Sequence, residues 1–110
     1  METLRILGQV SPAADTNGDL IVVPSAVAHV LSSLVVCNTS TGSRTFRVHA
    51  RPAGAATATG NAIIYDNTIA AGETIAVQLG ITLAATDVLT VRTSGGTGVT
   101  YTAFGSEVEA

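Results

Sequence analysis

The sequence predicts an all-β protein, a single antiparallel β-sandwich of about eight short strands that forms one domain over residues 1–110. Apolar runs recur at roughly 8–14-residue spacing, and each ends in Gly, Pro, Asn, Asp or Ser, as in sandwiches and barrels. Several runs alternate apolar and polar residues, which gives a strand one buried and one wet face. No segment sustains the helical period. A jelly-roll and an immunoglobulin-like strand order both fit this pattern.

The first part of the chain supplies three apolar runs and their turns. The first run ends before Ser11-Pro12, and Asn17-Gly18 is a turn signal before the second. The apolar stretch 20–37 is long enough for a membrane span, but Pro24 and several Ser and His residues interrupt it, and its β-branched residues favour strands. We therefore expect two strands around a turn there. The strands expected in this part are Leu4–Val10, Leu20–Val23 and Val27–Cys37.

Alternation is clearest in the rest of the chain. Phe46, Val48 and Ala50 alternate with polar residues, and the same pattern recurs over residues 74–79 and 88–93, so each of these strands has one face for the core. Residues 53–61 are rich in Ala, Thr and Gly, which predicts a long loop. The strands expected here are Arg44–Arg51, Ala62–Tyr65, Thr74–Leu79, Val88–Thr93 and Val99–Phe104.

Two turns repeat one chemistry. Ala70-Ala71-Gly72-Glu73 precedes one strand, and Ala84-Ala85-Thr86-Asp87 precedes another. In each, an acidic residue opens the strand directly after the turn. We expect its oxygens to accept hydrogen bonds from backbone N–H groups that the strand ladder leaves free.

The composition indicates a weakly charged surface that other subunits cover. Apolar residues make up 46% of the chain and charged residues 12%, the mean hydropathy is +0.45, and there is no lysine. Sheet proteins that stay monomeric place lysine and other charges on their edges to prevent strand addition by neighbours. We therefore expect a homo-oligomer, most simply a cyclic one, with a trimer favoured.

Charge and cysteine content exclude several classes of function. The net charge is −3 and the arginines are scattered along the chain, so we expect no nucleic-acid partner. The first ten residues lack the apolar core of a secretory signal, and we expect no membrane segment. The single cysteine, Cys37, excludes an internal disulfide, and its place at the end of an apolar run predicts a position in the core.

No constellation of residues predicts catalysis, a metal site or a cofactor, and we expect no enzymatic activity. There is no G-x-S-x-G elbow or local cysteine-protease signature. His29 and His49 lack a third metal ligand, so we expect solvated or interface histidines. Residues 15–19 place oxygens before Gly18, but the glycine stands fourth rather than sixth and Ala26 replaces the bidentate Glu of an EF-hand, which predicts a turn.

The most suggestive polar feature is a set of basic residues on one expected strand. Arg47, His49 and Arg51 share its outward face, and Arg44 lies just before them. Arginine is suited to bidentate contacts with carboxylates. We interpret Arg44, Arg47, His49 and Arg51 as a docking patch for an acidic partner. The alternative is a solvated strand face balanced by Asp and Glu on neighbouring strands.

Short segments that occur in a fixed order cover nearly the whole chain: Leu7–Val10, Val22–Pro24, Val35–Asn38, Thr45–Val48, Arg51–Gly54, Gly80–Asp87 and Phe104–Glu107. Together they resemble small all-β structural proteins of tailed bacteriophages. The resemblance implies an oligomeric virion component without catalytic residues, made in the host cytoplasm. Its expected role is that of a capsid decoration (cement) protein or a tail- or fibre-associated protein that contacts other capsid or tail proteins. A carbohydrate- or receptor-binding β-module of the adsorption apparatus is the alternative.

Overall fold

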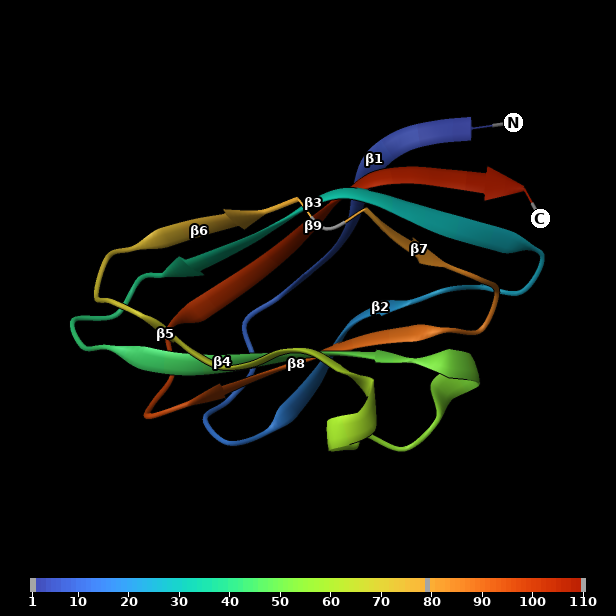
Figure 1. Ribbon diagram of the computed structural model, residues 1–110. Coiled ribbons are helices and arrows are strands. Elements are labelled where there is room, and N and C mark those ends of the chain that lie inside the picture. Colours follow the sequence, from blue (N-terminus) through green and yellow to red (C-terminus); the bar gives the residue numbers. More distant parts are fainter. Residues whose placement is uncertain (1, 79, 110) are drawn as a thin grey trace.

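The computed structural model describes residues 2–78 and 80–109, which form two antiparallel sheets packed face to face (Figure 1). Sheet A has the strand order β1-β9-β3-β6, with β7 also paired to β3, and sheet B has the order β2-β8-β4-β5. The predicted β-sandwich is thus confirmed. The strands of the described residues are β1 (Glu2–Val10), β2 (Asn17–Val22), β3 (Val27–Asn38), β4 (Arg44–Arg51), β5 (Ala62–Ile69), β6 (Thr74–Val77), β7 (Ile81–Leu83), β8 (Val88–Ser94) and β9 (Val99–Glu109).

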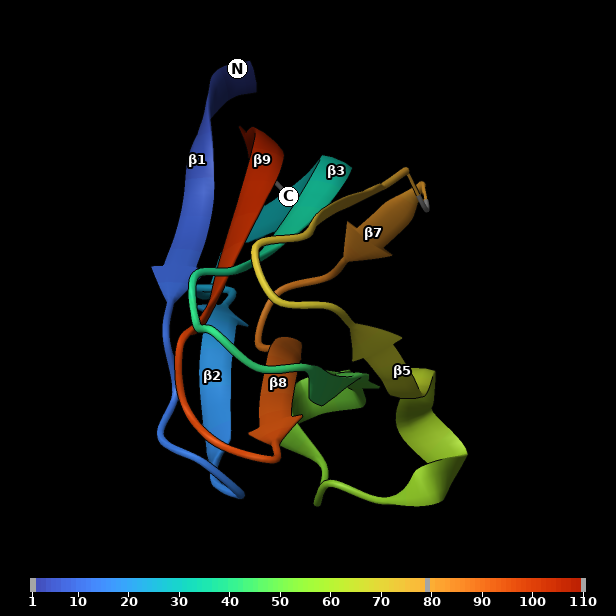
Figure 2. The same ribbon diagram turned by 90° about the vertical axis from the view of Figure 1, so that its left-hand side faces the viewer.

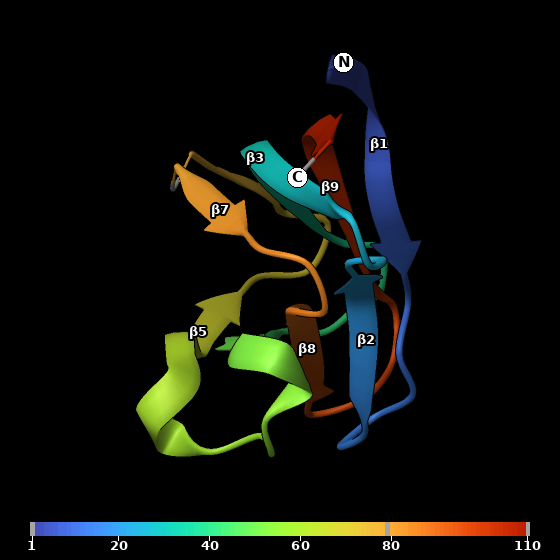
Figure 3. The same ribbon diagram turned by 90° about the vertical axis from the view of Figure 1, so that its right-hand side faces the viewer.

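The strands pair as in one long antiparallel ribbon folded over itself. β1 pairs with β9, β2 with β8, β3 with β6 and β7, and β4 with β5, so the pairs nest from the two chain ends inward. Successive pairs fall alternately in sheet A and sheet B, and the side views show the two layers (Figures 2 and 3). This nesting is the jelly-roll topology, which decides between the two strand orders that the sequence leaves open.

Several strand boundaries differ from the predicted ones. Four strands extend by two or more residues over mainly polar segments, where pairing with a neighbouring strand maintains them. The apolar runs in the sequence do not predict these ends. The sequence also does not predict β7, a short strand on the flank of β3. The predicted strand 74–79 ends at Val77, and Leu79 lies outside the described residues. The strands extended by two or more residues are β1, which begins at Glu2 rather than Leu4, β2, which begins at Asn17 rather than Leu20, β5, which ends at Ile69 rather than Tyr65, and β9, which ends at Glu109 rather than Phe104. β3 and β8 each extend one residue beyond the predicted end, to Asn38 and Ser94.

The core lies between the sheets and is built from their inward-facing residues. Phe46 of β4 and Tyr101 of β9 meet edge to face, with ring centroids 6.3 Å apart and an interplanar angle of 63°. The Tyr101 hydroxyl lies 2.6 Å from Thr93 Oγ1, and burial raises the pKa of Tyr101 to about 12. This contact joins sheet B to sheet A. The alternation predicted for β4 and β8 is confirmed at its buried positions, which include Phe46, Val48, Leu89 and Val91.

Two bulges flank β9 at the same height. Leu7 is the extra residue of β1 and Ser32 that of β3, and both bulges lie beside Phe104. Next to them, a Cβ on Gly105 would meet the carbonyl oxygen of Val30 on β3. Only glycine lets the two backbones approach this closely. Bulges bend a strand and increase its local twist, so they set the curvature of sheet A.

The two repeated turns have the chemistry that the sequence predicts. The acidic side chain accepts a hydrogen bond from the N–H three residues before it, at 2.8 Å for Glu73 and 2.9 Å for Asp87. The preceding residue has a positive φ in both turns, 72° at Gly72 and 70° at Thr86. Asp87 also accepts a hydrogen bond from Ala53 N–H at 2.8 Å. It thereby ties the segment after β4 to the turn before β8.

The replacement Phe46→Ala should lower the free energy of unfolding by about 3–5 kcal/mol, because it removes a ring that is only 1% exposed and leaves a cavity beside Tyr101. Urea denaturation followed by circular dichroism measures the change. Ile63→Ala, at a half-exposed position of β5, serves as control and should change stability by less than about 1 kcal/mol. Equal midpoints for the two variants would show that the faces of β4 are assigned backwards.

Gly105→Ala should lower the free energy of unfolding by about 2–3 kcal/mol, because its methyl group must displace the backbone of β3. Gly60→Ala is the matched control, since nothing lies within 4 Å of a Cβ at that position. Thermal unfolding of both variants compares them. A Gly105→Ala protein as stable as Gly60→Ala would contradict the close approach of β3 and β9.

Candidate functional site

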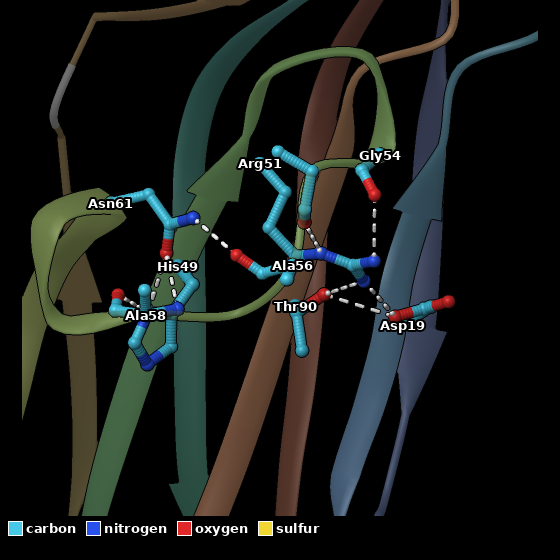
Figure 4. A network of polar contacts seen from close by, with 9 residues as sticks. Asp19, His49, Arg51, Gly54, Ala56, Ala58, Asn61 and Thr90 are labelled. Atoms are coloured by element: carbon cyan, nitrogen blue, oxygen red, sulfur yellow. Dashed lines mark hydrogen bonds and ion pairs between the residues drawn. The ribbon is translucent and has the colours of Figure 1, made fainter.

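The outer face of sheet B carries most of the basic residues that the sequence singles out. Arg47, His49 and Arg51 alternate with core residues along β4, as predicted. This face is not fully exposed to solvent, however. Residues 52–61, with the 3-10 turns η1 (Pro52–Gly54) and η2 (Thr59–Asn61), hydrogen-bond to these side chains and cover part of the face (Figure 4).

Arg51 uses its guanidinium to hold this loop against the sheet. Its Nε donates to Ala55 O at 2.6 Å and its Nη2 to Gly54 O at 3.1 Å. Its Nη1 donates to Thr90 Oγ1 at 3.0 Å and to Asp19 Oδ1 at 3.2 Å (Figure 4). Arg51 is therefore largely occupied by contacts within the chain.

The two histidines are buried within the chain, so the expectation that they are solvated is wrong. His49 is 3% exposed, and its Nδ1 lies 2.9 Å from Asn61 Oδ1 and 3.0 Å from Ala58 O. Because both neighbours are acceptors, Nδ1 carries the proton. His29 is 2% exposed, and its Nε2 lies 3.1 Å from Glu107 Oε2. In each case the partner comes from another segment, whose position the local sequence pattern does not give.

Arg47 is enclosed by a bulge of β5. Its Nε and Nη2 donate to the two carboxylate oxygens of Asp66, at 2.6 and 3.2 Å, and its guanidinium carbon lies 4.2 Å from the centroid of the Tyr65 ring. Residues 65 and 66 both oppose Arg47 in the strand register, and Asp66 has a φ of 51°. The hydrogen bonds raise the pKa of Arg47 and lower the pKa of Asp66. The positive charge of Arg47 is thus already paired.

Arg92 of β8 completes the site, although it does not belong to the basic patch that the sequence predicts. It stands directly opposite Arg47 in the β4–β8 register. Its Nε is buried without a hydrogen-bond partner, and its Nη2 lies 3.9 Å from Asp15 Oδ1. The only signal in the sequence is its outward position in the alternating run 88–93. The two arginines, His49, Tyr65 and the loop line a hollow of about 270 Å³.

Arg44 lies apart from this site. Its Nε donates to Thr97 O at 3.0 Å in the turn between β8 and β9, and its Nη1 donates to Ser43 O at 3.0 Å. The four residues predicted as one patch therefore do not form one surface. The structure brings Arg47 and His49 together with Arg92, and it separates Arg44 from them.

A second surface lies on the outer face of sheet A. Leu4 is 80% exposed, Ile6 52%, Val30 38% and Phe104 37%, and they come from the three adjacent strands β1, β3 and β9. These four residues, here called the apolar face, border a shallow hollow of about 490 Å³. Their number on adjacent strands distinguishes them from apolar residues scattered singly over a surface.

A polar cluster joins the same three strands. Arg5 donates to Glu107 Oε2 at 2.6 Å, and the same oxygen lies 3.1 Å from His29 Nε2. The hydrogen bond from His29, and then the charge and hydrogen bond of Arg5, lower the pKa of Glu107. One carboxylate thereby links β1, β9 and β3.

The remaining candidate residues do not form a further site among the residues that the structure describes. Cys37 is half-buried, with Thr74 Oγ1 3.5 Å from its Sγ, and the neighbouring Asn38 is buried instead, so the predicted core position of Cys37 is wrong. Among residues 2–78 and 80–109, no group of three or more His, Cys, Asp or Glu side chains could hold a metal ion. Over the same ranges, no helix has the length and apolar character needed to cross a membrane.

The chain is similar in fold to part of a viral particle protein. It matches the Gx strain structure of infectious bursal disease virus with a TM-score of 0.52, at 14% identity over 97% of this chain and 32% of that chain. The VP2 subviral particle of the same virus gives a TM-score of 0.52, at 15% identity over 97% of this chain and 31% of that chain. The T13 particle gives 0.51, at 15% identity over 96% of this chain and 30% of that chain.

These similarities show the fold of the chain, and its function has to be inferred from the surfaces described above. The chain spans about a third of the length of the chains that it matches. No family model and no curated protein matches the sequence. A jelly roll serves in viral capsids, in lectins and in cupins, so the fold alone does not select among these roles.

The contribution of Glu107 to the stability of the fold should depend on pH. Its folded-state pKa is lowered, so its stabilisation is present above its unfolded pKa of about 4.3 and is lost as the pH falls through the lower folded value. The variant Glu107→Gln should be less stable than the wild type at pH 7, and the two should converge between about pH 5 and pH 3. Melting temperatures measured across this range test it. Parallel profiles would contradict the role of Glu107.

Proposed function

We propose that this chain is a structural component of a virion, an oligomeric jelly-roll subunit that acts through protein–protein contacts. The main support for this proposal is the apolar face. Leu4, Ile6, Val30 and Phe104 are exposed on adjacent strands, where burial against another subunit removes them from water. The chain has few charges with which to keep such a face solvated, since charged residues make up 12% of it.

The edge of sheet A supports a second copy of this chain as the covering partner. Among the described residues, β1 lies at the edge and pairs with β9 on its other side. Leu4 and Ile6 project from this same strand, so the apolar face continues to the edge. No lysine guards the edge against strand addition. The assembly we propose is a cyclic homo-oligomer, with a trimer favoured.

The comparisons support a virion role in general. The solved structures reported above, which are similar in fold, are of infectious bursal disease virus. The assignment to a tailed bacteriophage, and to a capsid decoration (cement) or tail-associated protein, rests on the resemblance of the sequence segments. We propose the capsid surface first, because many weak repeated contacts around a symmetric shell suit a small subunit with an apolar face. The chain would then reside in the virion after synthesis in the host cytoplasm.

The double variant Leu4→Glu/Ile6→Glu should turn the oligomer into a monomer, because two carboxylates cannot be buried unpaired in the contact. Light scattering across a range of protein concentrations measures the mass. Both positions are exposed, so the circular dichroism spectrum should not change. Ile63→Glu is the matched control, since it adds a charge at an exposed apolar position of sheet B and should leave the oligomer intact.

Two outcomes would contradict this proposal in different ways. A wild-type chain that is monomeric at every concentration, with a melting temperature independent of concentration, would overturn the oligomer and favour the carbohydrate- or receptor-binding module. An oligomer that survives Leu4→Glu/Ile6→Glu would show that the subunits meet through another surface.

A further inference from the structure

We infer that the hollow on the outer face of sheet B binds a carboxylate group, with Arg92 as its principal contact. The hollow has a volume of about 270 Å³ and lies between β4, β8 and the loop 52–61. It is remote from the apolar face, which lies on the outer side of the other sheet. The inference therefore does not depend on the proposed assembly.

The charges on two neighbouring strands favour an anion beside Arg92. Arg47 and Arg92 are directly opposite in the β4–β8 register, and like charges in that position destabilise a sheet. Asp66 neutralises Arg47 through two hydrogen bonds. Among the described residues, Arg92 has Asp15 at 3.9 Å, beyond hydrogen-bond distance, and it shares the more distant charge of Asp66 with Arg47. A carboxylate hydrogen-bonded to Arg92 would reduce the repulsion between the two guanidinium groups.

The hollow also offers hydrogen-bond donors to a ligand. The Nε of Arg92 is buried by protein atoms and has no acceptor within the described part of the chain, but 31% of the side chain is exposed, so a ligand meets the outer N–H groups of the guanidinium. Thr57 and Thr59 line the same hollow from the loop, and their hydroxyl groups can donate to a ligand. The guanidinium fork and these hydroxyls are the donors that a planar carboxylate accepts from.

The net charge of the site favours a carboxylate over a dianionic phosphate. Two arginines face two nearby acids, Asp15 and Asp66, so the surroundings offer little excess positive charge. Asp66 would repel a second negative charge placed beside Arg47. The volume is also below that of most small-molecule pockets, and it fits a group the size of an acidic side chain. The ring of Tyr65 supplies an apolar wall for its methylene groups.

The hollow is held in shape before any ligand arrives. Arg51 fixes the start of the loop through Gly54 and Ala55, and His49 fixes its end through Ala58 and Asn61 (Figure 4). A preorganised site loses less entropy on binding.

The experiment is a titration of the isotopically labelled full chain with sodium acetate, followed by NMR at the Arg92 Nε–H and at the amides of residues 57–59. Sodium chloride at equal ionic strength and inorganic phosphate are titrated in parallel. Acetate should give saturable shifts, and Arg92→Gln should weaken binding by about tenfold or more. Arg44→Gln is the matched control, an arginine variant outside the hollow that should bind as the wild type does.

A second measurement guards against a merely structural role for Arg92. Because the substitution removes one of two opposed cations, Arg92→Gln should melt at the same temperature as the wild type or higher. The titration is repeated in the Leu4→Glu/Ile6→Glu background, so that occupation of the hollow by a neighbouring copy is separated from the property of the single chain.

Several outcomes would overturn the inference. Shifts with acetate no larger than with chloride, or equal shifts in Arg92→Gln, would remove the site. A lower melting temperature of Arg92→Gln would make Arg92 a structural residue. Phosphate binding tighter than acetate would refute the carboxylate assignment. If acetate binds, N-acetylglutamate α-amide is titrated in the same way. Tighter binding of this compound than of acetate would identify an acidic side chain of a protein as the natural ligand, and equal affinities would identify a free carboxylate.

Discussion

The pairing of β9 between β1 and β3 is the interaction on which the rest of the structure depends. At one end of sheet A it pairs Val108 with Glu2, which brings the two ends of the chain together. At the other end of the sheet it pairs Val99 with Asn38. Every other pair of the jelly roll nests inside this closure. Because the partners of β9 lie far away in the sequence, its formation requires loop closure over almost the whole chain, which predicts slow folding by comparison with helical domains. The absence of a side chain at Gly105 permits the close approach of β3, and the bulges on both sides allow sheet A to bend at that point.

The parts of the fold that the sequence predicts are those in which local periodicity decides. The core positions of β4 and β8 follow from the alternation of Phe46, Val48, Leu89 and Val91, and the two acidic turns follow from their composition. The ends of β5 and β9 do not, because partner strands rather than apolar residues maintain them. The burial of His49 depends on Asn61 and Ala58 of the covering loop. The pairing of Arg47 with Asp66 depends on a bulge that no local pattern in β5 indicates. Arg92 enters the site only through the register with β4.

The two-residue period of the strands also separates the two candidate surfaces. Along β1, Leu4 and Ile6 face outward, while Arg5 between them turns to the other side and reaches Glu107. The outer side of sheet A is therefore apolar although its inner side at the same height carries an ion pair. Sheet B shows the reverse, with an apolar inner side and a basic outer side. A jelly roll of this size can thus present one face for burial against a subunit and an opposite face for a polar contact, and the two can act independently.

The loop 52–61 shows how the basic face is maintained. Neither of its 3-10 turns contributes a buried residue, so burial of apolar surface does not hold it in place. Arg51, His49, Asn61 and Asp87 hold it by hydrogen bonds instead. Ordering a segment of this length costs conformational entropy, and these polar contacts offset it. The ordered loop forms one wall of the hollow that contains Arg92, whose Nε remains without an acceptor. The ion pair of Arg92, to Asp15 at 3.9 Å, is weaker than that of Arg47 with Asp66, although Arg47 faces Arg92 directly across the β4–β8 register. Two like charges placed directly opposite each other are typical of a binding site, since a face that only supported the sheet would be more stable without Arg92.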